Sequence, residues 1–575
     1  MDDEDTSDIE SDGHDESACH DAADELCIPL STQVCSSPIS ECPFSPMAPF
    51  IEDSQPDQLT ESEPNEQMCE TYADVSTPIT PNTTSIEWKG FKIVGDNLDL
   101  TIHPRNQTMQ NQTKSLHFFH SYAVQDRINL SGYSDKCSNI APFAMNLHSL
   151  LPSDEDMETL ISNFAVLIAR ILVKHVPAFA VFSDVVSQHI THEYYAEMSA
   201  KSEVVGLGII LKNENVIDEM IEVLEDLSQY IPQRKDPHVH KEDESLPIHN
   251  CHHILLGGDQ LTAVRARSAI RMRQNSETGS GKLQGFIPIV EDWHAKVILL
   301  GVVWTRLYCK GTSSEKGTLL QLKNLINRTS VPRDPKNDVN SSEEFFEIVF
   351  AAHAISAVMV HFDMESVNDT IKSMPADIST CDPKTKCDIL HSALKNIIRN
   401  HVNLTLDGTQ LEGTDKVLSY AQQVFTLGLL HAEYQDAIRE GDGLRVIRCW
   451  RLMLPLFKSA NRKNYALEAL NLLWQYNVVL SPRQKMQLVW SRFVNTKGKP
   501  GCNVACDMHM EHMNRACKDV LAHLGANISN TSIVRVGRCI GPITKVTERF
   551  DSETNITPTL SSHSAASIQK DLATI

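Results

Sequence analysis

The chain has 575 residues, 41% of them hydrophobic and 22% charged, a composition typical of folded globular proteins. No stretch reaches the roughly 18 consecutive apolar residues of a membrane helix, and the start Met-Asp-Asp-Glu-Asp lacks the basic residues and apolar run of a secretory signal. We therefore expect an intracellular protein without a membrane partner, whose 15 cysteines are free thiols.

The net charge of −24 is concentrated at the N-terminus. Residues 1–88 contain 22 of the 75 acidic residues and no Lys or Arg, which leaves 53 acidic residues against 51 basic ones. A segment rich in Asp, Glu, Ser, Pro and Thr buries too little apolar surface to offset the entropy lost on ordering. We predict a disordered acidic arm over residues 1–85, which either binds protein partners or serves only as a solubilising tail.

The body of the protein begins with a predicted group of strands. Phe91–Val94, Leu98–His103 and Ser115–Val124 have the apolar pattern of strands, and we expect them to open an antiparallel sheet. Residues 153–232 then have a pattern that indicates helices.

Two short apolar segments follow, and each leads into a helical pattern. His253–Leu256 ends in Gly-Gly-Asp and precedes a predicted helix over 261–274. Gly285–Val290 precedes a second predicted helix over 295–308. These segments indicate buried strands of a mixed α/β protein.

The C-terminal half is predicted to be almost entirely helical. Residues 341–480 indicate a helical insertion, and residues 481–547 contain the last clear helix, Asp507–Leu524. The α/β body would thus consist of residues 86–340 and 481–547. Residues 548–575 are predicted to be a disordered tail.

Two aspartates follow a glycine at the predicted ends of strands. Asp96 follows the first strand and Asp259 follows the strand His253–Leu256. Carboxylates at the ends of adjacent strands can converge on Mg²⁺ or Mn²⁺, which prefer oxygen ligands. Glu511, on the last helix, would complete a two-metal site for phosphoryl transfer. From the residues alone, a turn or a helix cap is the commoner role of an Asp such as Asp259.

Several strings of residues, in one order along the chain, resemble a eukaryotic family called domain of unknown function 6589. The resemblance spans roughly residues 88–545. The strings that carry it include Val94–Asp99, Lys114–His120, Gly257–Arg267, Glu291–Lys296, Lys316–Leu319, Asn327–Thr329, Arg439–Gly443 and Glu511–Arg515.

The order of the acidic residues is also similar to that of cut-and-paste transposases with an RNase H-like fold. Those proteins place one Asp on the first strand, a second Asp after the fourth, and a Glu on a late helix that follows inserted helices. The resemblance implies an RNase H-like core in which Asp96, Asp259 and Glu511 bind Mg²⁺ or Mn²⁺. It also implies cleavage of DNA phosphodiesters or strand transfer.

Some features depart from the transposase pattern and leave alternatives open. A helical segment lies between the two aspartates, and no leading Asn precedes Glu511 at the usual spacing. Asp99 is an alternative first acid, and Glu468 is an alternative last acid.

His294 belongs to an Asp/Glu-x-x-His element that the same resemblance implies. Either Glu291 or Asp292 would be its acidic member, and His294 would be catalytic. A core histidine that packs beside Trp293 fits the sequence equally well.

Basic residues follow the predicted acids on two helices. They are candidates for sequence-independent contacts to DNA phosphates, although a solvated helix face with ion pairs fits equally well. The candidates are Arg265, Arg267, Arg271, Arg273, Arg515 and Lys518.

A zinc site is not favoured by the sequence. Cys502, Cys506, His509 and His512 are possible zinc ligands, but the histidines lie on a predicted helix beside Glu511.

The leading hypothesis is a transposon-derived protein of the nucleus that cleaves DNA or has lost this activity. The alternative is a non-enzymatic scaffold of the nucleus or cytoplasm, in which the carboxylates are structural.

Overall fold

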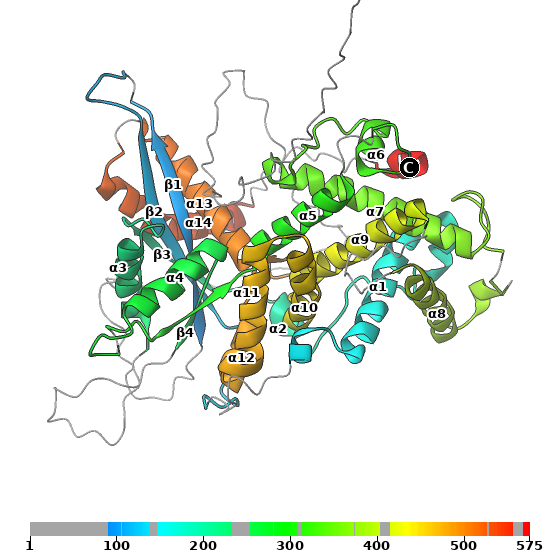
Figure 1. Cartoon of the computed structure of the whole chain (residues 1–575), viewed down its shortest axis with the longest axis horizontal. Helices are drawn as coiled ribbons and strands as arrows, with labels where there is room; N and C mark the ends of the chain where they lie inside the picture. Colours follow the sequence, from blue (N-terminus) through cyan, green and yellow to red (C-terminus); the bar gives the residue numbers. More distant parts are fainter. Residues whose placement is uncertain are drawn as a thin grey trace, which may run out of the picture. The chain divides into compact units, whose positions relative to one another are not determined.

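A mixed sheet of five strands organises the α/β part of the structure, a computed structural model (Figure 1). The spatial order of the strands is β3-β2-β1-β4-β5. Antiparallel pairing joins β1 to β2 and β2 to β3, whereas β4 is parallel to β1 and β5 is parallel to β4. The strands are β1 (Phe91–Ile102), β2 (Lys114–Gln125), β3 (Val204–Ile210), β4 (Ile254–Gly258) and β5 (Phe286–Val290).

The structure describes most of the chain after residue 89, and all described residues belong to one unit of the chain. The predicted acidic arm, residues 1–85, lies outside them. The described ranges are 90–104, 106–136, 147–232, 253–279, 281–308, 313–372, 374–375, 377–402, 415–525, 528–555 and 567–575.

The parallel strands β4 and β5 are short and apolar because helices cover both of their faces. All five residues of β4 are buried, and so are four of the five residues of β5. Strands that are buried on both faces have continuous runs of apolar residues, whereas strands buried on one face alternate apolar and polar residues. The prediction of two buried strands at these positions is confirmed.

One face of the sheet packs against two helices that follow strands. The helices α3 (Ile217–Leu227) and α4 (Gln260–Met272) share an apolar cluster with Ile93 of β1 and Leu256 of β4. In α3 the residues at helical spacing are the buried ones, so its apolar stripe faces the sheet.

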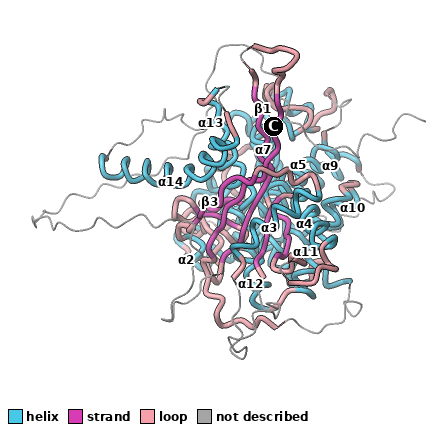
Figure 2. Tube along the Cα trace, turned by 90° about the vertical axis from the view of Figure 1, so that its left-hand side faces the viewer, coloured by secondary structure: helices cyan, strands magenta, loops and turns pink. Residues whose placement is uncertain are grey.

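The other face of the sheet is covered by two C-terminal helices (Figure 2). The helix α13 (Cys506–Ala522) packs its Met510 against Val94 of β1. The helix α14 (Asn530–Thr554) packs against β3 and against α13. These two helices therefore return to the first described strands, which lie far from them in the sequence.

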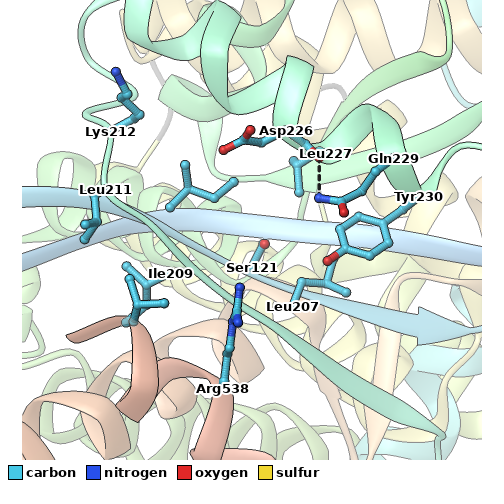
Figure 3. A pocket seen from close by; sticks show the side chains of 12 residues that line it. Ser121, Leu207, Ile209, Leu211, Lys212, Asp226, Leu227, Gln229, Tyr230 and Arg538 are labelled. Carbon is cyan, nitrogen blue, oxygen red and sulfur yellow. Dashed lines mark hydrogen bonds between the residues drawn. The ribbon is translucent and has the colours of Figure 1, made fainter. Parts of the chain in front are cut away.

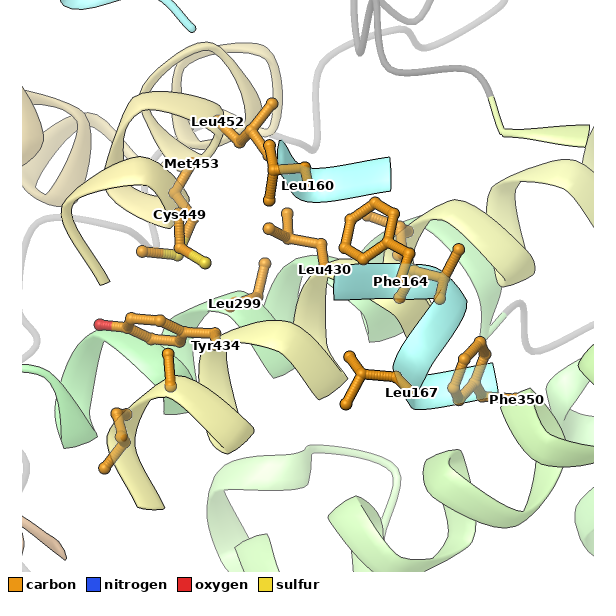
Figure 4. Close-up of a cluster of buried hydrophobic side chains, with 14 of the residues drawn as sticks. Leu160, Phe164, Leu167, Leu299, Phe350, Leu430, Tyr434, Cys449, Leu452 and Met453 are labelled. Carbon is orange, nitrogen blue, oxygen red and sulfur yellow. The ribbon is translucent and has the colours of Figure 1, made fainter. Parts of the chain in front are cut away.

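Beside the sheet lies a large helical core. Phe164 and Leu167 of α1 lie near Phe350 of α7 and Leu430 of α9 in this core (Figure 4). The predicted helical insertion over 341–480 thus shares its core with helices that precede it in the chain. The helices concerned are α1 (Asp154–His175), α5 (Trp293–Leu307), α7 (Val339–His361), α8 (Pro383–His401), α9 (Lys416–Glu440), α10 (Gly443–Ser459) and α11 (Lys463–Trp474).

The remaining elements are shorter. They are α2 (Tyr195–Ser199), α6 (Leu319–Leu325), α12 (Pro482–Trp490), α15 (Gln569–Thr574) and the hairpin of β6 (Phe493–Asn495) and β7 (Asn503–Ala505).

Among the described residues, α7 is the one helix that is long and apolar enough to cross a membrane. In its most apolar window 56% of the residues are buried inside the protein. Phe350 and ten other residues of α7 are buried. The apolar character of α7 is therefore that of a core helix.

Two predictions for the first strands are wrong. Phe91–Val94 and all but the last residue of Leu98–His103 belong to one continuous strand, β1, and the third antiparallel strand is β3. Gly95 does not end a strand: a Cβ atom there would lie 2.1 Å from the ring of Phe119 on β2. The glycine thus makes room for a cross-strand aromatic ring and not for a turn.

The segment 153–232 is not entirely helical, because it contains β3. The sequence Val-Val-Gly-Leu-Gly-Ile-Ile has two glycines, which weaken its strand pattern. Gly208 has a φ of +93°, and the pairing with β2 shifts register beside it. The predicted tail 548–575 is also wrong in part, since α14 extends to Thr554 and α15 follows it.

Candidate metal centre

Parallel pairing of β1 and β4 brings two carboxylates side by side. Val94 on β1 is the partner of Gly257 on β4. Asp96 and Asp259 each follow two residues later, so their side chains meet beside the two strands. Asp96 shares a strand face with Val94, the face that packs on α13.

A third carboxylate, Glu214, completes the group. Oxygen atoms of Asp96, Glu214 and Asp259 all lie within 4.8 Å of one another. Glu214 is 1% exposed, and both of its carboxylate oxygens accept from the Thr262 hydroxyl, at 2.8 and 3.0 Å. It lies in the connection from β3 to α3.

The sequence analysis missed Glu214 because it missed β3. Two antiparallel steps separate β3 from β1, so the two strands run in the same direction. Residues that follow β3 therefore reach the side of the sheet where Asp259 follows β4. Recognising Val204–Ile210 as a strand would have marked the acidic residue after it as a candidate.

Asp259 is a helix cap as well as a member of this group. Its Oδ1 accepts the backbone N–H of Thr262 at 2.7 Å, as the N-cap of α4. The capping role that the sequence left open is therefore present. It also fixes the carboxylate beside Asp96.

The three carboxylates repel one another strongly. Burial and then the charges of Asp259, Glu214 and Glu511 raise the pKa of Asp96 well above its usual range. Burial and the charge of Asp259 raise the pKa of Glu214 to about 8. The ionised cluster therefore favours a cation, and all of its donors are the oxygen ligands that Mg²⁺ and Mn²⁺ prefer.

Glu511 lies next to this group and not within it. Burial raises the pKa of Glu511, and among the smaller effects the charge of Asp259 acts in the same direction.

The helix that holds Glu511, α13, is attached to the sheet by hydrogen bonds of Asn514. The Asn514 side chain donates to the Asn97 carbonyl at 3.1 Å and lies 2.9 Å from Nδ1 of the buried His120.

His294 stands between Glu511 and Asp507. Its Nδ1 is 3.1 Å from Asp507 Oδ2, and its Nε2 is 3.8 Å from Glu511 Oε1. Burial opposes its protonation, but the hydrogen bond and charge of Asp507, with Asp259 and Asp96, raise the pKa of His294 to about 10. An imidazolium thus faces the carboxylates at neutral pH.

The two acids before His294 lie in the core beneath the centre. Glu291 and Asp292 are both fully buried. Lys92 Nζ donates to Glu291 at 2.8 Å, and the Arg492 guanidinium donates to both oxygens of Asp292, at 2.6 and 2.9 Å. Their charges are compensated by ion pairs, so neither is available as the acidic member of an Asp/Glu-x-x-His element.

The two alternative acids have partners of their own. Asp99 lies 2.5 Å from Nδ1 of His117. Glu468 of α11 forms an ion pair with Arg267 of α4. Neither belongs to the group of three carboxylates.

Tyr465, one turn before Glu468 on α11, also faces the centre. Burial and then the charge of Asp259 raise its pKa well above its usual range, with smaller effects from Asp507 and Asp96. Its ring packs edge-on against Phe457, with the ring centroids 5.9 Å apart. A neutral phenol from the helical core therefore borders the carboxylates.

The six basic candidates divide into three pairs. Arg267 pairs with Glu468 and Arg273 pairs with Glu225, so for these two the ion-pair alternative holds. The charge of Arg265 opposes the rise in the pKa of Glu214, and the charge of Lys518 opposes the rise in the pKa of Glu511, so both cations lie near these carboxylates. The other two candidates, Arg271 and Arg515, are exposed.

The four possible zinc ligands do not gather. Among the described residues, Cys502, Cys506, His509 and His512 form no group that could hold a metal ion. The Cys506 thiol is buried and donates to the Ser491 carbonyl.

A cavity of about 480 Å³ lies along β3, away from the carboxylates (Figure 3). Its lining residues include Leu207 and Ile209 of β3, Tyr230, which follows α3, and Arg538 of α14. The buried Ser121 hydroxyl also lines it and has no hydrogen-bond partner among the described groups. None of the candidate metal ligands lines this cavity.

Comparison with known proteins gives one match. A family model described as "Family of unknown function (DUF6589)" matches residues 144–563. The match includes Glu214, Asp259, His294 and Glu511, whereas Asp96 precedes it. No curated protein matches the chain, and no solved structure matches it.

Proposed function

We propose that this chain, which belongs to the DUF6589 family of unknown function, is a transposon-derived protein of the nucleus that cleaves or joins DNA phosphodiesters. We also infer that its sheet is an RNase H-like core. In support, the first strand carries Asp96, the fourth strand precedes Asp259, and the late helix α13 carries Glu511. This is the order of acids in the transposases that the sequence resembles.

The observation that carries the proposal is the approach of three carboxylates within 4.8 Å. Asp96, Glu214 and Asp259 would hold Mg²⁺ or Mn²⁺, with Glu511 as a further ligand on the side of α13. A bound pair of such ions activates water or a 3′-hydroxyl and stabilises the leaving oxygen of a phosphodiester. Ligands of this kind also leave coordination sites for substrate phosphates.

The surrounding side chains fit an anionic substrate. The charges of Arg265 and Lys518 act against the raised pKa values of Glu214 and Glu511, so both cations border the centre. These groups would bind the DNA backbone by charge and not by sequence.

Metal-dependent nicking of double-stranded DNA by the full chain tests this function. Asp259→Asn removes a charge from the centre but keeps a side chain that can cap α4. The matched control is Asp338→Asn. The Asp338 side chain caps α7 by accepting the backbone N–H of Ser341, three residues later, as Asp259 accepts that of Thr262.

We expect nicking with Mg²⁺ or Mn²⁺ for the wild type and for Asp338→Asn, and a loss of about 100-fold or more for Asp259→Asn. Nicking that does not need a metal ion, or that survives in Asp259→Asn, would show that these carboxylates are not the active centre. A folded wild type that cleaves nothing would favour the scaffold alternative, with the acidic arm as a site for protein partners.

A further inference from the structure

The N-terminus of α5 is not capped by the side chain of the residue that precedes the helix. Its N-cap residue is Asp292, whose side chain makes no capping hydrogen bond. That carboxylate instead accepts from Arg492, Tyr434 and Trp450. The backbone amides in the first turn of α5 therefore need another acceptor.

Asp507 of α13 supplies that acceptor from a distant part of the sequence. Its two oxygens accept the backbone N–H groups of Trp293 and His294, each at 2.9 Å. The carboxylate thus caps α5 across the junction of two helices. Asp507 is 3% exposed, so water does not compete for these bonds.

The same carboxylate also holds the His294 ring. Its Oδ2 lies 3.1 Å from Nδ1 of that ring, and the Trp293 ring packs edge-on against the imidazole with centroids 4.5 Å apart. The backbone N–H and the ring Nδ1 of His294 are both held by Asp507, and the ring packs against Trp293, so the imidazole is held in one orientation. Its Nε2 is the ring nitrogen that remains for another partner.

Nε2 is directed toward the metal centre because of the spacing on α13. Asp507 and Glu511 are four residues apart and share a helix face. Asp507 contacts one ring nitrogen, and Glu511 lies 3.8 Å from the other. Asp507 does not belong to the group of three carboxylates.

We propose that Asp507 is a positioning residue that orients His294 so that Nε2 is held toward the substrate phosphate. This inference rests on the proposed function. His294 contacts the substrate, and Asp507 acts only through it. The ligand class is the phosphodiester of a nucleic acid.

Nicking kinetics of the full chain test the inference with Asp507→Asn, His294→Gln and the double variant. Each single change is expected to lower kcat by about 10–100-fold. If Asp507 acts through His294, the double variant loses no more than the worse single variant. Losses that multiply would overturn the proposal, because they would show that Asp507 acts independently.

A readout without catalysis separates this inference from the proposed function. In protein with ¹⁵N-labelled histidine, the side-chain NMR signals of His294 are identified by their loss in His294→Gln. They should shift in Asp507→Asn and stay unchanged in the capping control Asp338→Asn. If the wild type cleaves no DNA, the proposed function fails, and unchanged His294 signals in Asp507→Asn would overturn the positioning role itself.

Discussion

Asp126 is a buried carboxylate outside the metal centre, directly after β2. Its Oδ2 accepts a hydrogen bond from Gln487 at 2.9 Å, while its Oδ1 has no partner among the described groups. Burial raises the pKa of Asp126 to about 6, although Gln487, Lys92 and Arg483 act in the opposite direction. Ionisation of the Asp126 carboxyl therefore opposes folding.

This carboxyl should make stability depend on pH. Since the pKa of Asp126 in the folded state exceeds the value of about 3.9 in an unfolded chain, the folded protein binds the proton more tightly. Stability should therefore fall as the pH rises from about 4 through about 6, by at most about 3 kcal/mol. Urea unfolding of Asp126→Asn should show a gain over the wild type near pH 7 that is absent near pH 4. An equal difference in unfolding free energy at both pH values would contradict this prediction.

At the residue scale, two of the three carboxylates that lie together could be predicted from local order in the sequence. Asp96 follows Gly95 within β1 and Asp259 follows Gly258 at the end of β4, and parallel pairing of these strands brings the two side chains together. Glu214 and Asp507 were not predictable in this way. Their places depend on β3 and on the trans-capping of α5, which are set by contacts between distant segments.

At the scale of elements, the junction of α9 and α10 depends on one glycine. Gly441 ends α9 with a φ of +73°, a conformation that costs side-chain residues about 1–2 kcal/mol. A Cβ atom there would also lie 2.9 Å from the side chain of Asn503 and 3.0 Å from Met198. The turn is therefore constrained both by its backbone and by the packing of the β6–β7 hairpin.

The two constraints can be separated with a second glycine. Gly317 has a φ of +85°, but a Cβ atom there would meet nothing within 4 Å. We expect Gly317→Ala to cost only the backbone term of about 1–2 kcal/mol, and Gly441→Ala to cost clearly more. Denaturant unfolding measures both. Equal losses in unfolding free energy would show that the packing around Gly441 relaxes freely.

The elements also show where pattern reading succeeds. The helices α4, α5 and α13 were predicted to within a few residues, because each has a clear beginning and a regular apolar pattern. The strand β3 was missed because its two glycines and its irregular pairing with β2 obscure the strand pattern. Gly95 indicated a turn, whereas it in fact accommodates the ring of Phe119.

At the scale of the whole molecule, helices of the helical core border the group of carboxylates. The helix α11 places Tyr465 beside the carboxylates and binds α4 through the pair of Glu468 with Arg267. The helix α5 has His294 in its first turn and continues into the core against α9. Any change in the packing of these helices should therefore reach the centre.

The central claim is that Asp96, Glu214 and Asp259 form a divalent-metal site. Isothermal titration of the full chain with Mn²⁺ tests it most directly, with Asp96→Asn, Glu214→Gln and the remote control Asp338→Asn as comparisons. We predict that the wild type and Asp338→Asn bind Mn²⁺ equally, and that the other two variants bind at least about ten-fold more weakly. Equal Mn²⁺ affinity in all four proteins would contradict the account.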